Sequence, residues 1–216
     1  MRAMSSTIPT SRWSTALNYV GLRRLACVHL GALVLVACAT PAPQNARFAE
    51  LTYGHLGKLR LEVSTIDVRS AYQPTLSPPS VEHLFPIAPE QVMRRWAADR
   101  LAATGAPGRR AVFTIRDARV IETKLARTQG IAGAFTRDQT ERYDMTLEAT
   151  LEIGGERPDL GRGTISAKSI RARTVSEGIT VNERERIWYE LLEAAMNDLN
   201  AELEAQIREK LALFLQ

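Results

Sequence analysis

The stretch that most restricts the fold is residues 139–153, in which apolar side chains occupy every odd position from 143 to 153. The even positions from 142 to 152 are charged or carry threonine. Strict alternation predicts an antiparallel strand with one buried face and one face in water. The apolar face consists of Tyr143, Met145, Leu147, Ala149, Leu151 and Ile153. Any fold for this chain must therefore cover one side of a sheet and leave the other side polar.

Three further stretches alternate in the same way. Residues 59–69 alternate with a change of phase, which predicts a single strand with a bulge near Ser64 and Thr65. Residues 111–123 alternate until the phase slips at Asp117. Residues 163–176 alternate more weakly and complete a set of four expected strands.

Two stretches have helical spacing. Residues 89–104 place apolar side chains at positions 92, 93, 96, 97 and 101, with Pro89 suited to the first turn. Residues 182–215 carry a longer apolar stripe, and Asn182 and Glu185 predict a reciprocal N-terminal cap. This second helix would be about 50 Å long, against about 33 Å for a ten-residue strand. We therefore expect it either to bend or to project beyond the sheet.

The expected order is strand, helix, three strands, helix. Two amphipathic helices and an antiparallel sheet with one polar face predict an α+β two-layer sandwich. We expect a four-stranded, mainly antiparallel sheet with both helices on one face, in a single domain over residues 48–216.

The N-terminal part of the chain has the layout of a secretory signal peptide. Arg23 and Arg24 precede an apolar run of about a dozen residues, too short to span a bilayer, which needs about 20. The run ends in Leu35, Val36, Ala37 and Cys38, which resemble the lipobox of bacterial lipoproteins. The resemblance implies that residues 1–37 are removed and that Cys38 carries a diacylglyceryl group and a further acyl chain such as palmitate. The alternative is that Cys38 is a buried core cysteine.

Residues 38–47 contain two prolines and no apolar pattern, so we expect a lipidated tether between membrane and domain. The segment before Arg23 is long for a signal peptide, and a start near Val20 would give a compact one. In the lipoprotein family, an Asp after the lipidated cysteine tends to retain the protein at the inner membrane. Ala39 stands there instead, so the resemblance implies the periplasmic face of the outer membrane, with the inner membrane as the alternative.

The charge of the chain argues against nucleic acid as a partner. The chain has 28 basic and 24 acidic residues, and four of the basic residues and none of the acidic ones lie in residues 1–37. The mature chain would therefore carry no net charge and would exert no long-range attraction on phosphate groups.

The sequence offers no catalytic constellation. The histidines beyond the signal peptide are His55 and His83, each isolated in a predicted loop, so we expect no metal and no cofactor. Asp144 and Glu148 share a strand face but lie about 13 Å apart, too far for a glycosidase pair. We expect a protein that is not an enzyme. The alternative is an enzyme or small-ligand module with a cleft near His55 or His83.

Three apolar features are candidates for partner binding. One is the loop 127–138, in which glycines flank Ile131 and Phe135; the alternative is an ordinary hairpin loop. Another is the patch of Leu84, Phe85 and Ile87 in a proline-rich loop, which could equally plug the core. The last is Phe214, which needs a partner if the final helix overhangs the sheet and closes the core if it does not.

This order of elements behind a lipobox is similar to that of small periplasmic lipoproteins that assist envelope transport. They include the lipopolysaccharide-assembly lipoprotein and the auxiliary lipoproteins of ABC-type lipid transporters. The former often has Gly-Phe after the cysteine, where this chain has Ala39 and Thr40. The resemblance implies a non-enzymatic accessory protein that binds another envelope protein, a partner complex or a lipid-type cargo.

Overall fold

The structure is a computed structural model, and it describes residues 48–126, 139–155 and 160–216. The chain divides into two units, Met1–Asn45 and Ala46–Gln216, and the described residues belong to the second. The lipobox at Leu35–Cys38, the tether and the loop residues Ile131 and Phe135 lie outside the described residues.

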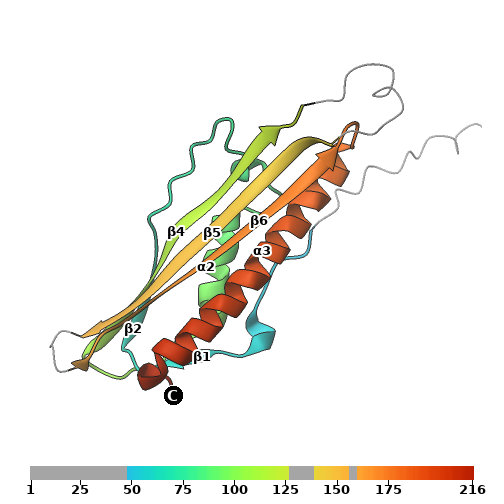
Figure 1. Cartoon of the computed structure of the whole chain (residues 1–216). Helices are drawn as coiled ribbons and strands as arrows, with labels where there is room; N and C mark the ends of the chain where they lie inside the picture. The colour runs from blue at the N-terminus through green and yellow to red at the C-terminus, as the bar shows by residue number, and fades with distance from the viewer. Residues whose placement is uncertain (1–47, 127–138, 156–159) are drawn as a thin grey trace, which may run out of the picture. The chain divides into compact units, whose positions relative to one another are not determined.

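A four-stranded sheet forms one layer of the domain (Figure 1). Its strands are β2 (Thr65–Ser70), β4 (Arg109–Lys124), β5 (Gln139–Gly155) and β6 (Gly163–Ser176), in the order β2-β4-β5-β6. The pairs β4–β5 and β5–β6 are antiparallel, whereas β2 runs parallel to β4. The predicted α+β fold is confirmed, and all six apolar side chains of the alternating stretch in β5 are buried.

The phase slip predicted at Asp117 is confirmed as a bulge. The register of β4 against β5 shifts between Ile115 and Asp117. Before the shift Phe113 and Ile115 face the core, and after it Ala118 and Val120 do. The extra residue lets a strand with two phases keep its apolar side chains on one face.

The prediction of one bulged strand over residues 59–69 is wrong. Residues Leu59–Leu61 form β1, which pairs in parallel with β3 (Leu101–Ala103) in a separate two-stranded sheet. The chain then crosses to the main sheet at Ser64, whose N–H and hydroxyl both donate to the Arg109 carbonyl, at 2.9 and 2.7 Å. The change of phase in the sequence therefore coincides with the passage of the chain from one sheet to the other. Val63, at this passage, is fully buried.

The first long helix, α2 (Pro89–Arg100), ends four residues earlier than predicted. Leu101 adopts an extended backbone and begins β3, where Leu59 of β1 is its partner. The position of Leu101 in the apolar pattern fits a helix or a strand equally well. The residue is extended because it pairs with Leu59 of β1.

The second long helix, α3 (Val181–Lys210), begins with a capping box formed by Thr180 and Glu183. The Glu183 N–H donates to the Thr180 hydroxyl at 3.2 Å, and the Thr180 N–H donates to the Glu183 carboxylate at 2.8 Å. The prediction that Asn182 caps the helix with Glu185 is wrong by two residues. Thr180 and Glu183 have the same three-residue spacing, and the helix begins with that pair.

Of the two alternatives expected for the last helix, bending or projecting beyond the sheet, the structure does not show the projection. The 30 residues of α3 span about 45 Å, and the 17 residues of β5 span about 56 Å. Phe214, in the short 3-10 helix η5 (Ala212–Phe214), is only 6% exposed. Gly163 permits this, because a Cβ there would lie 2.4 Å from Leu211 and 2.9 Å from Phe214.

Both long helices pack on one face of the sheet, as predicted (Figure 1). Trp96 of α2 packs on Phe113 of β4, with ring centroids 5.5 Å apart. Trp188 of α3 meets Tyr143 of β5 edge to face at 5.5 Å. The opposite face of β5 carries charged residues and threonines, so the second sheet face is polar.

Candidate functional site: a proline-rich cap and its pockets

The cap loop (residues 71–88) contains the proline-rich patch predicted from sequence. The Val81 N–H donates to the Val120 carbonyl and the Glu122 N–H donates to the Pro79 carbonyl, both at 2.9 Å. These bonds attach the loop to the edge of β4 beyond the end of the shorter strand β2. The cap loop therefore continues the sheet on this side with irregular backbone.

A buried carboxylate fixes the cap loop to β4. Glu82, in the 3-10 helix η2 (Glu82–Leu84), accepts a hydrogen bond from the Tyr72 hydroxyl at 2.7 Å and one from the Val120 N–H at 3.4 Å. Burial and the bond to Glu82 raise the pKa of Tyr72 well above its ordinary value. Tyr72 therefore remains a hydrogen-bond donor at neutral pH.

The structure separates the three residues of the predicted apolar patch. Phe85 is buried and stacks on Trp188, with ring centroids 5.0 Å apart and the planes inclined by 6°. Ile87 is half-buried, whereas Leu84 is 53% exposed. Phe85 and Phe214 thus close the core, which is one of the two roles expected for each, and Leu84 is the member of the patch that faces solvent.

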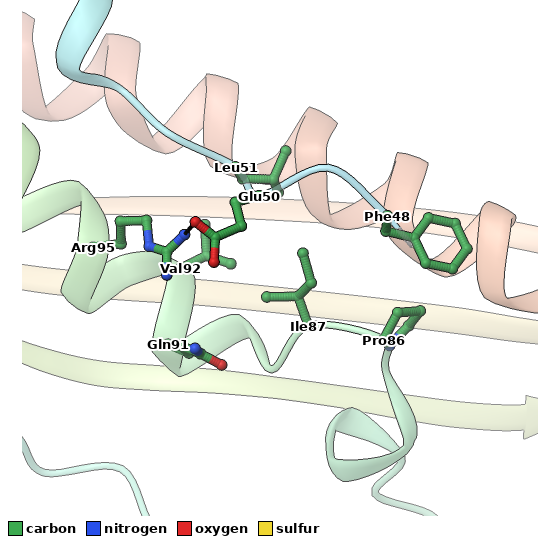
Figure 2. Close-up of a pocket in the computed structure, with 8 residues that line it drawn as sticks. All are labelled: Phe48, Glu50, Leu51, Pro86, Ile87, Gln91, Val92 and Arg95. Atoms are coloured by element: carbon green, nitrogen blue, oxygen red, sulfur yellow. Dashed lines mark ion pairs between the residues drawn. The ribbon is translucent and has the colours of Figure 1, made fainter. Parts of the chain in front are cut away.

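One pocket lies where the described chain begins (Figure 2). It has a volume of about 250 Å³ and lies between the first residues, the cap loop and α2. Phe48 stacks on Tyr189 of α3 at 5.2 Å, and Glu50 forms an ion pair with Arg95 of α2. These two contacts attach the first described residues, Phe48 and Glu50, to α3 and α2.

A second pocket, of about 510 Å³, lies beside the cap loop. Its walls are mostly apolar and include Pro78, Pro79 and Leu84. Three polar side chains border it: His83 from η2, and Glu122 and Lys124 from the end of β4. It could hold a small apolar group with one charged end.

His55 lines a third pocket, of about 360 Å³, with Tyr53 and Glu193. Burial, with a smaller contribution from Glu193, raises the pKa of Tyr53 to about 12. The pockets of His55 and His83 have no lining residue in common. Within the described ranges, no group of three His, Cys, Asp or Glu side chains could hold a metal ion.

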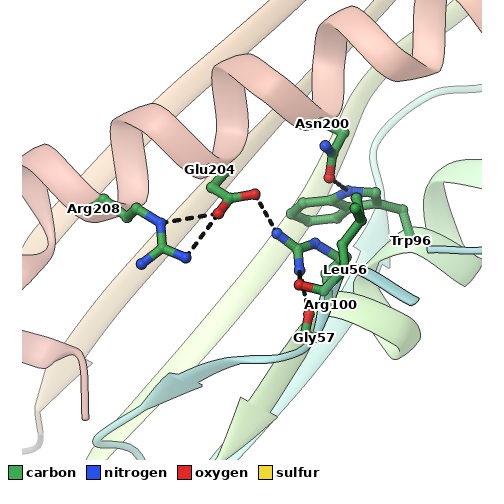
Figure 3. Close-up of polar contacts among 7 residues, drawn as sticks. All are labelled: Leu56, Gly57, Trp96, Arg100, Asn200, Glu204 and Arg208. Carbon is green, nitrogen blue, oxygen red and sulfur yellow. Dashed lines mark hydrogen bonds and ion pairs between the residues drawn. The ribbon is translucent and has the colours of Figure 1, made fainter. Parts of the chain in front are cut away.

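A buried ion pair between the helices was missed from sequence (Figure 3). Arg100 is 1% exposed; its guanidinium donates to the carbonyl of Leu56 at 2.7 Å, to that of Gly57, and to the Glu204 carboxylate of α3. Beside it, the Trp96 indole N–H donates to Asn200 at 2.8 Å. The signal was present, because Arg100 continues the apolar stripe of Met93 and Trp96 at helical spacing. Its role is to join α2, α3 and the 3-10 helix η1 (Gly54–Leu56).

No family model matches this chain, and no curated protein matches it in sequence. Several solved structures resemble it in part, including the following three. A minor lipoprotein from Acinetobacter baumannii is 14% identical with a TM-score of 0.33, over 68% of this chain and 92% of the other. The rare lipoprotein B from Shewanella oneidensis is 10% identical with a TM-score of 0.31, over 67% of this chain and 97% of the other.

The third is a Xanthomonas campestris protein of family DUF330, which is 12% identical with a TM-score of 0.26, over 78% of this chain and 95% of the other. Two of these three neighbours thus bear the name lipoprotein. Among the described helices, none is long and apolar enough to cross a membrane.

Proposed function

We propose that this protein is a lipid-anchored accessory protein of the bacterial cell envelope, held at the periplasmic face of the outer membrane by acyl chains on Cys38. The observation that carries the proposal is the sequence Leu35-Val36-Ala37-Cys38 at the end of an apolar run preceded by two arginines. Two or more acyl chains anchor a protein stably, at about 0.8 kcal/mol per buried methylene group. The polypeptide itself then needs no contact with the bilayer.

The start of the folded part is consistent with such an anchor. Ten peptide units connect Cys38 with Phe48, so the chain can reach at most about 35 Å from the membrane surface to the domain. The contacts Phe48–Tyr189 and Glu50–Arg95 then fix the domain end of this connection on the two helices. A partner would therefore be met within a short distance of the membrane.

A non-enzymatic role is part of the proposal. His55 and His83 line different pockets, and the carboxylate of Glu82, the buried acid of the cap loop, is engaged by Tyr72 and by β4. The buried Arg100 is used to join helices. Glu82 and Arg100 therefore maintain the fold, and we assign to the exposed surfaces the binding of a partner complex or a lipid-type cargo.

Fractionation of cells that produce the full chain tests the proposal. The wild-type protein is expected in the outer-membrane fraction and should resist extraction by high salt, because acyl chains are not displaced by ions. The Cys38→Ser variant should be absent from that fraction or be removed by salt. Salt-extractable wild-type protein, or equal membrane retention of the variant, would contradict the proposal.

The second pocket supports a second candidate function, a binding module for a small amphiphilic ligand. The walls formed by Pro78, Pro79 and Leu84 suit an apolar chain, and Lys124 suits an anionic end. Titration with a dansyl-labelled fatty acid tests this candidate. Saturable binding that Leu84→Asp abolishes and Leu213→Asp leaves unchanged would favour it, since Leu213 is 89% exposed outside any pocket described above. Absence of binding would rule it out for this ligand class.

A further inference from the structure

The two edges of the main sheet differ in how they are covered. On the β2 side the open edge is short, because β2 has only six residues and the cap loop occupies the edge of β4 beyond it through the hydrogen bonds of Val81 and Glu122. On the other side the sheet ends at the 14-residue strand β6, and no backbone of the described chain pairs with its outer edge. The outward N–H and C=O groups of such an edge are available to another strand.

The outer edge of β6 lacks most of the features that block strand addition. It contains no proline, and its register with β5 is continuous from Gly163 to Val175. Ile170, near its middle, is 65% exposed on the polar face of the sheet. A large apolar side chain in that position would gain burial from a neighbouring strand.

The charged side chains of β6 are all basic. Lys168 contacts Glu148 of β5 at 3.3 Å, and Arg171 and Arg173 contact Asp198 and Glu190 of α3 at 2.5 and 3.8 Å. All three basic side chains remain about half exposed. Each can therefore meet a second carboxylate presented from outside the sheet.

We propose that the outer edge of β6 is a docking strand for an extended acidic segment of a partner protein, which adds to the sheet as a fifth strand. The inference rests on the accessory role proposed above and names the chemistry of its partner. Main-chain hydrogen bonds supply the attachment in this mode, and side chains on alternate positions supply selectivity.

A second copy of this chain fits the edge poorly. Pairing two β6 strands antiparallel about a two-fold axis near Ile170 places the Arg171 side chains of the two copies diagonally across from each other and offers no carboxylate to Lys168, Arg171 or Arg173. Diagonal neighbours on paired strands lie within reach of long side chains, so the two Arg171 side chains would repel each other. A segment with carboxylates at those positions avoids this repulsion and contacts the basic side chains favourably.

The test is a titration of the full, lipidated protein in detergent with a fluorescein-labelled peptide of alternating threonine and glutamate. A peptide with lysine in place of glutamate is the matched probe. Fluorescence anisotropy reports binding, and amide hydrogen exchange reports which strand is covered. We expect the acidic peptide to bind about tenfold more tightly than the basic one and to slow exchange in β6.

Two variants locate the site without disturbing the core. Ile170→Glu places a carboxylate on the exposed side of β6 and should weaken binding of the acidic peptide about tenfold. Leu213→Glu introduces the same charge at an exposed position in η5 and should leave binding unchanged. Circular dichroism of both variants confirms that the sheet is retained.

Three results would overturn the proposal. They are equal binding of both peptides, no binding of the acidic peptide, and a wild-type dimer that Ile170→Glu dissociates. No binding would mean that the basic side chains only protect the edge, and the dimer would identify a second copy as the occupant. Incorporation of radiolabelled palmitate in the same preparation tests the lipid anchor independently. Protein that is labelled but does not bind the peptide would refute the docking strand and leave the anchor supported.

Discussion

At the scale of single residues, the fold depends on polar groups placed inside the apolar layer. Arg100 donates to the backbone carbonyls of Leu56 and Gly57 and to the Glu204 carboxylate from a site that is almost fully closed to water. Glu204 also accepts hydrogen bonds from Arg208 one turn later, at 2.8 and 2.9 Å. A charge in such a site costs desolvation free energy and is retained only while its partners are present.

Arg100→Ala is therefore expected to lower the free energy of unfolding by about 3 kcal/mol, since it removes the donor to the Leu56 and Gly57 carbonyls, breaks the ion pair with Glu204 and opens a cavity. Urea denaturation measures the change. Arg94→Ala removes an exposed pair with Glu90 on the same helix and should cost less than about 0.5 kcal/mol. Equal effects of the two substitutions would show that the buried pair has no special role.

Tyr53 gives a prediction for alkaline pH. Its pKa is raised to about 12, chiefly by burial, so the folded state holds the phenol proton more tightly than the unfolded state does. The resulting stabilisation is complete below the ordinary tyrosine pKa of about 10 and is lost as the pH rises towards 12.

The Tyr53→Phe variant removes this titration. We expect it to lose about 2 kcal/mol less stability than the wild type between pH values of about 10 and 12. Denaturant midpoints measured across that range check the difference. Parallel curves for the two proteins would show that the buried phenol does not titrate differently in the two states.

At the scale of secondary-structure elements, the periodicity of apolar residues predicted which faces are buried. It did not predict the strand pairings or the element ends that depend on contacts between distant residues. The alternation in β5 and the slip at Asp117 were predictable because burial of one face imposes a period of two. The division of residues 59–69 between two sheets was not predictable, because β1 pairs with residues more than 40 positions away. The end of α2 at Arg100 depends on that same pairing.

The start of α3 provides a test at this scale. Thr180→Ala removes the side chain that accepts from the Glu183 N–H and should lower the free energy of unfolding by about 1 kcal/mol. Asn182→Ala, at the position expected from sequence to be the cap, should change it by only a few tenths of a kcal/mol. A larger effect at Asn182 than at Thr180 would place the cap where the sequence pattern first suggested it.

The α3–β6 seam belongs to the same scale. Two hydrogen bonds from Arg171 lower the pKa of Asp198 on α3 and close the seam with charged groups. The sequence predicted both elements but did not indicate that the outer edge of β6 would have no backbone partner among the described residues. Strand order depends on which strands pair, and periodicity within one strand carries no information about its neighbours.

At the scale of the whole molecule, the polar sheet face and the two-layer architecture were predictable, whereas the pockets were not. The cap loop was recognisable by its prolines, but its attachment to β4 relies on backbone bonds that no side-chain pattern indicates. The proposed function rests on a different kind of signal, the short sequence Leu35–Cys38, which we propose is recognised by processing enzymes. That motif and the fold are independent, so each requires its own test.

The mass of the N-terminal peptide of the mature protein tests the central proposal most directly. Protein purified from envelope membranes and digested with protease is expected to yield a peptide that begins at Cys38 and carries a thioether-linked diacylglyceryl group and an acylated amino group. A chain that retains residues before Cys38, or a Cys38 with an unmodified thiol, would contradict the lipid anchor and the envelope role built on it.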